Sequence, residues 1–221
     1  MIITGLTGSI GMGKSAAAAI LRRLRVPVHD ADATVHALLG PGGGAVPAVL
    51  AAFPGTGSLE TGIDRPELGR RVFGNPAALH RLERILHPKV AARERLFLAA
   101  SARRRAPLVI LDVPLLYETG GERRCDAVLV VSAPGFLQRQ RVLARPGMTA
   151  KRFGDILAKQ MPDRENRRHT PYVVETGLDK RHSLKMVLAF VRLIRSRHGT
   201  GTAYSDARSR PRYRNHRPRS G

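Results

Sequence analysis

Cysteine, acidic residues and long apolar runs are scarce in this chain of 221 residues. Its single cysteine, Cys125, excludes an intrachain disulfide, and we expect an inert, partly buried thiol in a cytoplasmic protein. The longest apolar runs are far shorter than a membrane-spanning helix, which needs about 20 residues. No charged segment followed by an apolar one opens the chain, so the sequence predicts neither a membrane span nor a signal peptide.

Basic residues outnumber acidic ones, with 38 lysines and arginines against 17 aspartates and glutamates and a formal net charge of +21. The stretch 195–221 holds eight of the arginines, one aspartate and no lysine, which leaves +14 for the rest of the chain. A basic surface suits nucleotides, coenzymes with several phosphates or nucleic acid, and its sign does not choose among them. Because 197–221 has no apolar periodicity, we expect a disordered basic tail there, with simple solvation favoured over nucleic-acid binding.

The stretch 2–15, which reads IITGLTGSIGMGKS, is the most informative part of the chain. An apolar run of strand length precedes a complete G-x-x-x-x-G-K-[ST] motif, and an Ala/Leu/Arg run of helical composition follows it. This order indicates a phosphate-binding loop, the alternative being a chance glycine-rich turn. The glycines let backbone N–H groups approach an anion, and the helix start adds the positive end of its dipole. The lysine would reach the β- and γ-phosphates and the serine hydroxyl would hold Mg²⁺. We expect ATP to be bound here by Gly8, Gly11, Met12, Gly13, Lys14, Ser15 and Ala16.

Carboxylates follow two further expected strands. A short strand from Val26 ends in Asp30-Ala31-Asp32, and a strongly apolar strand at 108–111 ends in Asp112. Ligands of open parallel sheets lie beyond the carboxyl ends of the strands, so these side chains are expected near the phosphate loop. Asp112 has the Walker B pattern of an Mg²⁺ ligand. Of Asp30 and Asp32, we expect one to cap the following helix and the other to take part in chemistry.

Apolar residues at helical spacing fill the block 33–103, which predicts a helical insertion without strands, interrupted at His87-Pro88. After a fourth strand at 127–131, two helices expected at 135–144 and 149–160 form a hairpin that carries Arg141 and Arg145. Their spacing of four places both on one expected helix face. P-loop kinases carry a lid at this point, although a solvated basic face would look the same. A fifth strand at 171–175 and an amphipathic helix at 183–195 complete the pattern.

Five apolar strands alternating with helices predict an α/β fold with a five-stranded parallel sheet, of the P-loop NTPase type, covered by helices. We expect one domain at 1–196. Its core would comprise 1–32 and 104–196, with the helical insertion at about 33–103 and the lid at about 139–160.

The chain resembles the dephospho-coenzyme A kinase family from residue 1 to about 178. The combination of matching motifs is specific, whereas each alone is weak. The matches are LTGSIGMGKS at 6–15, VHDAD at 28–32, GIDR at 62–65, LHP at 86–88, DVPLLYE at 112–118, the stretch 138–145 and Gln160. The resemblance implies ATP-dependent, Mg²⁺-assisted phosphorylation of the ribose 3′-hydroxyl of dephospho-CoA, the last step of coenzyme A synthesis.

The resemblance also implies residue roles. Asp32 would be the base that accepts the hydroxyl proton, and the insertion would bind dephospho-CoA. Lys14, Mg²⁺ and the lid arginines Arg141 and Arg145 would stabilise the transferred phosphoryl group. No role follows for His87 or Glu118, although both lie in matching motifs.

The sequence departs from the family pattern in three places. Ala16 stands where threonine is usual, which removes a hydroxyl near the α-phosphate. Thr170-Pro171 replaces an Ala-Asp pair before the fifth strand, which puts an adenine-side or structural contact in question. The basic tail has no counterpart in the pattern.

Two other functions fit parts of the sequence. A P-loop kinase for another small hydroxyl acceptor, such as a nucleoside monophosphate or a sugar acid, would share the chemistry and differ in the acceptor pocket. A nucleotide-gated RNA- or DNA-binding protein would use the positive charge and the tail. The second is disfavoured because no RNP, KH or zinc signature is present and the arginines are scattered.

Overall fold

The computed structural model describes residues 1–199 and contains a sheet of five parallel strands in the order β2-β5-β1-β6-β7. The strands are β1 (Ile2–Thr7), β2 (Val28–Asp30), β5 (Leu108–Asp112), β6 (Ala127–Ser132) and β7 (Tyr172–Glu175). Every residue of β5 is buried, as expected of a strand whose two faces are both covered. The predicted five-stranded α/β sheet is therefore confirmed.

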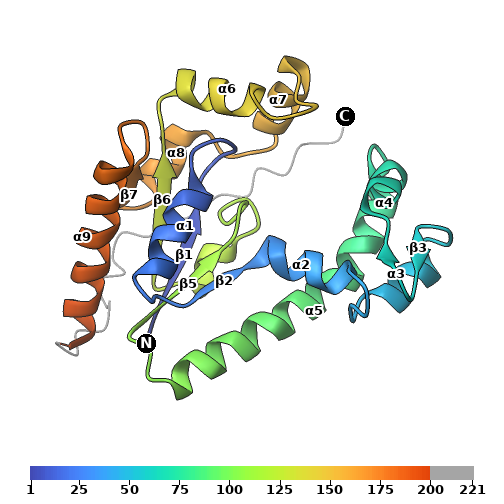
Figure 1. The fold of residues 1–221 in the computed structure, drawn as a ribbon, viewed down its shortest axis with the longest axis horizontal. Coiled ribbons are helices and arrows are strands. Elements are labelled where there is room, and N and C mark those ends of the chain that lie inside the picture. Colours follow the sequence, from blue (N-terminus) through green and yellow to red (C-terminus); the bar gives the residue numbers. More distant parts are fainter. Residues whose placement is uncertain (200–221) are drawn as a thin grey trace, which may run out of the picture.

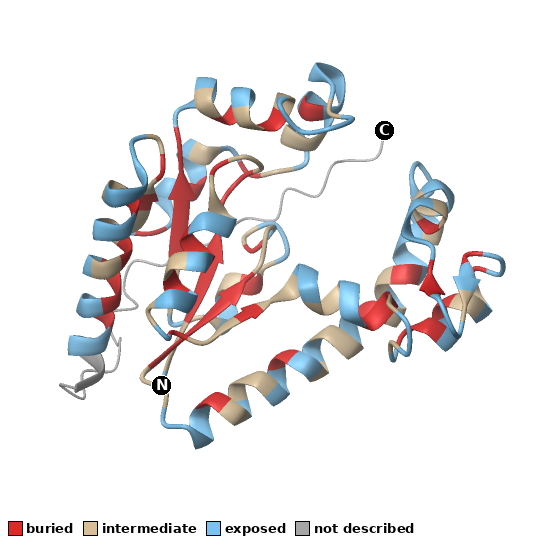
Figure 2. Ribbon diagram, viewed as in Figure 1, coloured by how far each residue is buried: buried red, intermediate tan, exposed pale blue. Residues whose placement is uncertain are grey.

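Helices α1 (Lys14–Arg23) and α9 (Lys180–Gly199) lie together against the sheet (Figure 1). Their apolar faces and the strands form one hydrophobic core, called here the sheet cluster, which includes Leu6, Leu21, Leu129 and Phe190. Figure 2 shows this cluster as buried strands lined by the buried side of α9. Helix α9 begins before and ends after the predicted range of 183–195.

The insertion folds around a hydrophobic core of its own, called here the insertion cluster, which includes Leu38, Val49, Leu68 and Leu82. Its helices are α2 (Ala31–Leu39), α3 (Val46–Ala52), α4 (Arg65–Val72) and α5 (Pro76–Arg103). Figure 1 shows α2 and α5 leaving the sheet together, with α3 and α4 at their far end. The N-terminal end of α2 thus lies at the sheet, and its C-terminal end belongs to the insertion cluster.

Two details of the insertion differ from the prediction. A small antiparallel hairpin, β3 (Gly57–Ser58) with β4 (Gly62–Ile63), lies in the block that was expected to be entirely helical. Strands of two residues are too short to show an alternating apolar pattern. The hairpin is built instead on glycine, because a Cβ on Gly57 would lie 2.1 Å from the Gly62 carbonyl oxygen.

Helix α5 is continuous through Pro88, so the predicted interruption at His87-Pro88 is wrong. Proline removes one backbone donor and usually kinks or ends a helix. Contacts on both sides of Pro88 hold this helix together. Leu82 and Leu86 are buried in the insertion cluster, while Glu94, near the sheet, pairs with Arg124 at 3.0 Å between Oε1 and Nε.

The remaining helices lie near the carboxyl ends of the strands or connect them. Helices α6 (Gly135–Leu143) and α7 (Ala150–Leu157) form the predicted hairpin, which lies beyond the end of β6 in Figure 1. Two short elements were not expected from the sequence: the 3-10 helix η1 (Gly121–Arg124) and α8 (Asp163–Arg168). No helix within residues 1–199 is both long and apolar enough to cross a membrane. The predicted tail falls, from residue 200 onward, outside the described residues.

Candidate active site

The loop between β1 and α1 has the backbone shape that its glycines predict. Gly11 and Gly13 have φ values of 77° and 93°, a region that side chains other than glycine rarely adopt. A Cβ on Gly11 would lie 2.5 Å from a methyl group of Val142 on α6. Gly13 is the N-cap of α1, and no side chain caps this helix end. The N-terminus of α1 therefore keeps the free N–H groups and positive dipole end that bind phosphate.

Two glutamines hold the loop at Ile10. The Gln138 side chain of α6 donates to the Ile10 carbonyl oxygen at 2.8 Å. The Ile10 N–H donates to the Gln160 side-chain oxygen at 2.9 Å, across 150 positions of sequence. Both glutamines belong to motifs that match the family. The structure shows that they connect the two ends of the predicted lid to the phosphate loop.

Met12, which was expected to bind the nucleotide, is buried and anchors the loop to the sheet. Its sulfur accepts the Ala133 N–H at 3.1 Å, and its carbonyl accepts the Thr176 hydroxyl at 2.5 Å. Thr176 follows β7, so the loop is attached to the ends of both β6 and β7. A loop fixed in this way meets the phosphates with little loss of conformational entropy on binding.

Glu118, for which the sequence suggested no role, supports the same loop indirectly. Its Oε1 accepts the N–H of Met161 at 2.6 Å. The Met161 carbonyl accepts hydrogen bonds from Ser9 and Asn166, at 3.3 and 3.1 Å. Met161 directly follows Gln160, so Glu118 fixes the segment from which Gln160 reaches Ile10. His87 is exposed on α5 and does not line the cleft.

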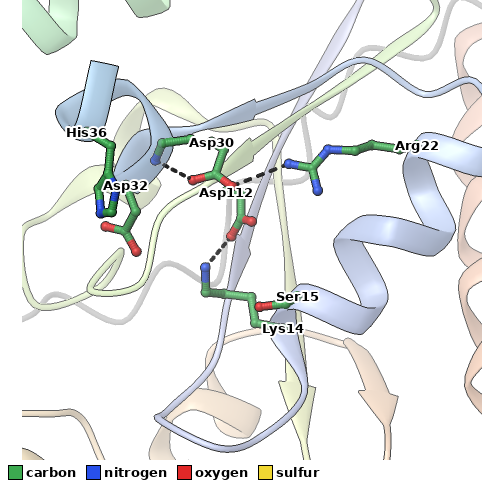
Figure 3. Close-up of a pocket in the computed structure, with 8 residues that line it drawn as sticks. Lys14, Ser15, Arg22, Asp30, Asp32, His36 and Asp112 are labelled. Carbon is green, nitrogen blue, oxygen red and sulfur yellow. Dashed lines mark hydrogen bonds and ion pairs between the residues drawn. The ribbon is translucent and has the colours of Figure 1, made fainter. Parts of the chain in front are cut away.

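A cleft of about 280 Å³ opens beside the phosphate loop (Figure 3). It brings together Lys14 and Ser15 of α1 with carboxylates from two strand ends. Asp30 of β2 and Asp112 of β5 are direct neighbours in the parallel register, so both lie at the carboxyl edge of the sheet. The full set of lining residues is Lys14, Ser15, Arg22, Asp30, Asp32, Ala33, His36 and Asp112.

Lys14 and Asp112 form an ion pair of 2.5 Å between Nζ and Oδ1 at the floor of the cleft. The Asp112 carboxyl is 3% exposed, and this burial raises its pKa above the usual range. The Lys14 ammonium opposes that effect, as does Arg22 more weakly, while Asp30 adds to it. Lys14 therefore favours the ionised form of a buried carboxyl group next to the position where phosphates would bind.

Asp30 is the capping aspartate of the pair. Its side chain accepts the Ala33 N–H at 2.9 Å at the start of α2, and it pairs with Arg22 at 3.4 Å. Asp32 lies in the first turn of α2, and its exposed side chain makes no hydrogen bond or ion pair with any residue in 1–199. The expectation that one aspartate caps is confirmed, and the capping leaves Asp32 as the free carboxylate facing the cleft.

The cleft also meets the requirements of the expected magnesium ion. Ser15 and Asp112 both line it and offer the oxygen ligands that Mg²⁺ prefers. Asp112 is buried at a strand end, where its negative charge is already balanced by a cation. No group of three or more His, Cys, Asp or Glu residues within 1–199 forms a complete protein cage. A site with few protein ligands is usual for Mg²⁺ that is shared with substrate phosphates.

The two lid arginines do not share a helix face as expected. Helix α6 ends at Leu143, and Arg145 lies beyond its C-cap, directly before Pro146, because the residue before a proline disfavours the helical conformation. The Arg145 side chain is exposed and forms no hydrogen bond or ion pair within 1–199, and only its backbone is hydrogen-bonded, to Val142 and Met148. Arg141 instead donates to the carbonyl and hydroxyl oxygens of Thr176, at 2.7 and 3.2 Å. Neither arginine lines the cleft.

A family model described as dephospho-CoA kinase matches residues 2–179 of this chain. The chain belongs to the dephospho-CoA kinase family. It is 62% identical over 195 residues to a dephospho-CoA kinase of Rhodospirillum rubrum. This match covers 88% of this chain and 92% of the relative. It is 59% identical over 213 residues to a dephospho-CoA kinase of Paramagnetospirillum magneticum, and this match covers 96% of this chain and 100% of the relative. A crystal structure from Thermus thermophilus superposes with a TM-score of 0.74 at 36% identity, over 87% of this chain and 96% of the other.

One departure from the dephospho-CoA kinase pattern is explained by the structure. The Thr170 hydroxyl donates to the Val128 carbonyl at 2.6 Å and accepts the Tyr172 N–H at 3.1 Å. It therefore joins the starts of β6 and β7, so Thr170-Pro171 leaves no gap in the sheet. Ala16 is exposed on α1.

Two cleft residues were not singled out from the sequence. Arg22 lies eight positions after Lys14 on α1 and pairs with Asp30, while His36 lies four after Asp32 on α2. The spacing of four between Asp32 and His36 was the available signal, because such residues are neighbours on a helix. Arg22 had no comparable signal, since its partner comes from another element.

Proposed function

We propose that Asp32 is the general base of this dephospho-CoA kinase and that Lys14 and Ser15 hold the phosphates and metal of the second substrate. The enzyme is an ATP-dependent phosphotransferase that acts on the ribose 3′-hydroxyl of dephospho-CoA and yields coenzyme A and ADP. The observation that carries the proposal is the free carboxylate of Asp32 in the cleft that also holds Lys14 and Ser15. Asp30 is engaged in capping and in an ion pair, which supports Asp32 as the base.

The arrangement suits phosphoryl transfer, in which positioning and charge neutralisation provide most of the catalysis. The acceptor hydroxyl would approach from the α2 side, where Asp32 takes its proton as the new P–O bond forms. A base must lie within about 2.6–3.2 Å of the hydroxyl oxygen. The N-terminus of α1 and Lys14 would bind the β- and γ-phosphates from the opposite side.

Mg²⁺, when bound, would neutralise phosphate charge and align the phosphates, with Ser15 and Asp112 as its protein ligands. Lys14, which pairs with Asp112 in this structure, would be the cation that binds the phosphates. Arg141 would contribute to the nucleotide site through Thr176, and Arg145 from the lid. A cytoplasmic location and the absence of nucleic-acid binding remain predictions from the sequence.

The test is turnover in an ATP-consumption assay with dephospho-CoA, together with ATP affinity, for the wild type, Asp32→Asn and Asp30→Asn. Asp32→Asn keeps the size of the side chain and removes its basicity, so we expect turnover to fall by about 10²–10⁴-fold with ATP affinity nearly unchanged. Asp30→Asn is the matched control and should act mainly on stability, through the weakened cap and ion pair.

Two results would contradict this proposal. If Asp30→Asn abolishes turnover and Asp32→Asn does not, the two carboxylates have the opposite roles. If the wild type consumes ATP faster with nucleoside monophosphates than with dephospho-CoA, the proposed acceptor is wrong, whereas the proposed phosphoryl transfer from ATP is not contradicted.

A further inference from the structure

His36 lies one helical turn after Asp32 and lines the same cleft, yet none of the roles above uses it. Residues four apart on a helix are neighbours on one face, with about 5–6 Å between their Cβ atoms. Figure 3 shows the imidazole beside the Asp32 carboxylate, with both side chains extending from the same side of α2. A substrate group that reaches Asp32 therefore also comes near His36.

Arg65 holds the imidazole from the insertion side. Its Nη1 lies 3.1 Å from Nδ1 of His36, and Arg65 is the first residue of α4. A guanidinium has only donors, so Nδ1 must be the acceptor in this contact. In a neutral imidazole the single proton is then on Nε2. The contact selects the tautomer in which His36 has a hydrogen-bond donor to offer to a ligand in the cleft.

We propose that His36 orients the acceptor by donating Nε2–H to the ribose hydroxyl next to the one that reacts. This inference rests on the proposed function, because it takes the acceptor to be a ribose with neighbouring 2′- and 3′-hydroxyl groups. Asp32 accepts a hydrogen bond from the 3′-hydroxyl, and His36 donates one to the 2′-oxygen. Two contacts prevent the sugar from rotating about a single hydrogen bond, so the reacting oxygen stays directed at the phosphate.

The experiment combines an enzyme variant with a substrate analogue. We would measure kcat/KM for the wild type and His36→Ala, each with dephospho-CoA and with its 2′-deoxy analogue. Loss of one hydrogen bond should lower kcat/KM for dephospho-CoA by about tenfold in His36→Ala. The wild type should lose a similar factor on the 2′-deoxy analogue, and His36→Ala should lose nothing further on it. The KM for ATP should stay the same throughout.

Two further variants serve as controls. His36→Gln keeps an N–H donor at similar reach and should recover most of the loss on dephospho-CoA, which a purely structural role would not predict. His80→Ala removes an exposed histidine of α5 that does not line the cleft, and it should match the wild type on both acceptors.

The inference is overturned if His36→Ala has a kcat/KM that is lower than that of the wild type by the same factor on both acceptors. It is also overturned if the two enzymes have the same kcat/KM on dephospho-CoA. A His36→Gln variant that folds like the wild type but shows no recovery also overturns it. A different result would reject the proposed function itself: a wild type that does not turn over dephospho-CoA at all.

Discussion

The proposed phosphate side and the proposed acceptor side of the cleft rest on different hydrophobic cores, and different numbers of contacts hold them in place. The phosphate loop lies on the sheet cluster and is fixed by side chains from α6, from the segment after α7 and from the end of β7. Asp32 and His36 lie on α2, which starts at the sheet and ends in the insertion cluster through Leu38. The acceptor side is thus positioned through one helix.

This difference suits the two tasks. ATP phosphates have a constant shape, and a preformed loop binds them without further ordering. Dephospho-CoA is large, and an insertion with its own core would offer it a binding surface separate from the phosphate loop. The Asp32 side chain, with no partner within residues 1–199, is available to the acceptor. The comparison leads to five predictions, in order of decreasing effect.

Lys14→Ala should show the largest effect, because it removes the flexible cation of the phosphate side. We expect turnover to fall by about 10³-fold or more while the fold is kept, by analogy with other cations that stabilise phosphoryl transfer. Steady-state kinetics at saturating ATP measure this, with the exposed residue Lys185 of α9, changed to Ala, as the control. A folded Lys14→Ala enzyme with a near wild-type rate would contradict the assignment.

The same variant has a pH signature. Burial raises the pKa of Asp112 and Lys14 opposes this, so without Lys14 the pKa rises further above its unfolded value. The folded state then favours the protonated carboxyl. The free energy of unfolding of Lys14→Ala should therefore be closest to that of the wild type at low pH. It should fall below the wild-type value as the pH rises through the folded-state pKa of Asp112. Denaturant unfolding at several pH values measures this, and a pH-independent difference would exclude it.

Replacing Arg145 by Ala should lower turnover by about 10²-fold, by analogy with arginines that stabilise phosphoryl transfer from a lid or finger. The stability should not change, because Arg145 is exposed and unpaired within the described part of the chain. The exposed Arg152 of α7 provides the matched control as Arg152→Ala. If Arg145→Ala and Arg152→Ala behave alike, Arg145 belongs to a solvated face.

Core substitutions test whether the two hydrophobic cores affect the binding of the two substrates independently. Leu129→Ala in the sheet cluster and Leu82→Ala in the insertion cluster should each lower the free energy of unfolding by about 2–5 kcal/mol. Leu82→Ala should raise the KM for dephospho-CoA and leave the KM for ATP unchanged, whereas Leu129→Ala should affect both. Equal effects on both substrates in the Leu82→Ala enzyme would show that the insertion is not an independent unit.

Glu118→Gln should have the smallest effect. The amide oxygen still accepts the Met161 N–H, but a neutral acceptor is weaker than a carboxylate by about 1 kcal/mol. We expect the KM for ATP to rise a few-fold, with a larger rise in Glu118→Ala and no change in the KM for dephospho-CoA. A change confined to the acceptor KM would mean that Glu118 supports the other side of the site.

Three details that sequence reasoning missed have identifiable physical causes. The β3–β4 hairpin is too short for periodicity. Pro88 stays within a helix because the insertion cluster holds α5 before it and the Glu94–Arg124 ion pair holds α5 after it. Arg145 has the right spacing from Arg141 but follows the end of the helix. A strand too short to show a pattern, contacts made outside the helix and the end of a helix before a proline account for these three differences.

The sequence by itself determined the phosphate loop, the parallel sheet and the carboxylates at its edge. These depend on local properties: glycine at positive φ, apolar runs of strand length and a fixed motif spacing. Only the tertiary structure decided that Asp30 caps α2, that Glu118 supports the Gln160 segment and that Arg65 selects the tautomer of His36. Hydrogen bonds such as that between Ile10 and Gln160 join residues 150 positions apart, and no local pattern specifies which distant partner the folded chain brings within reach.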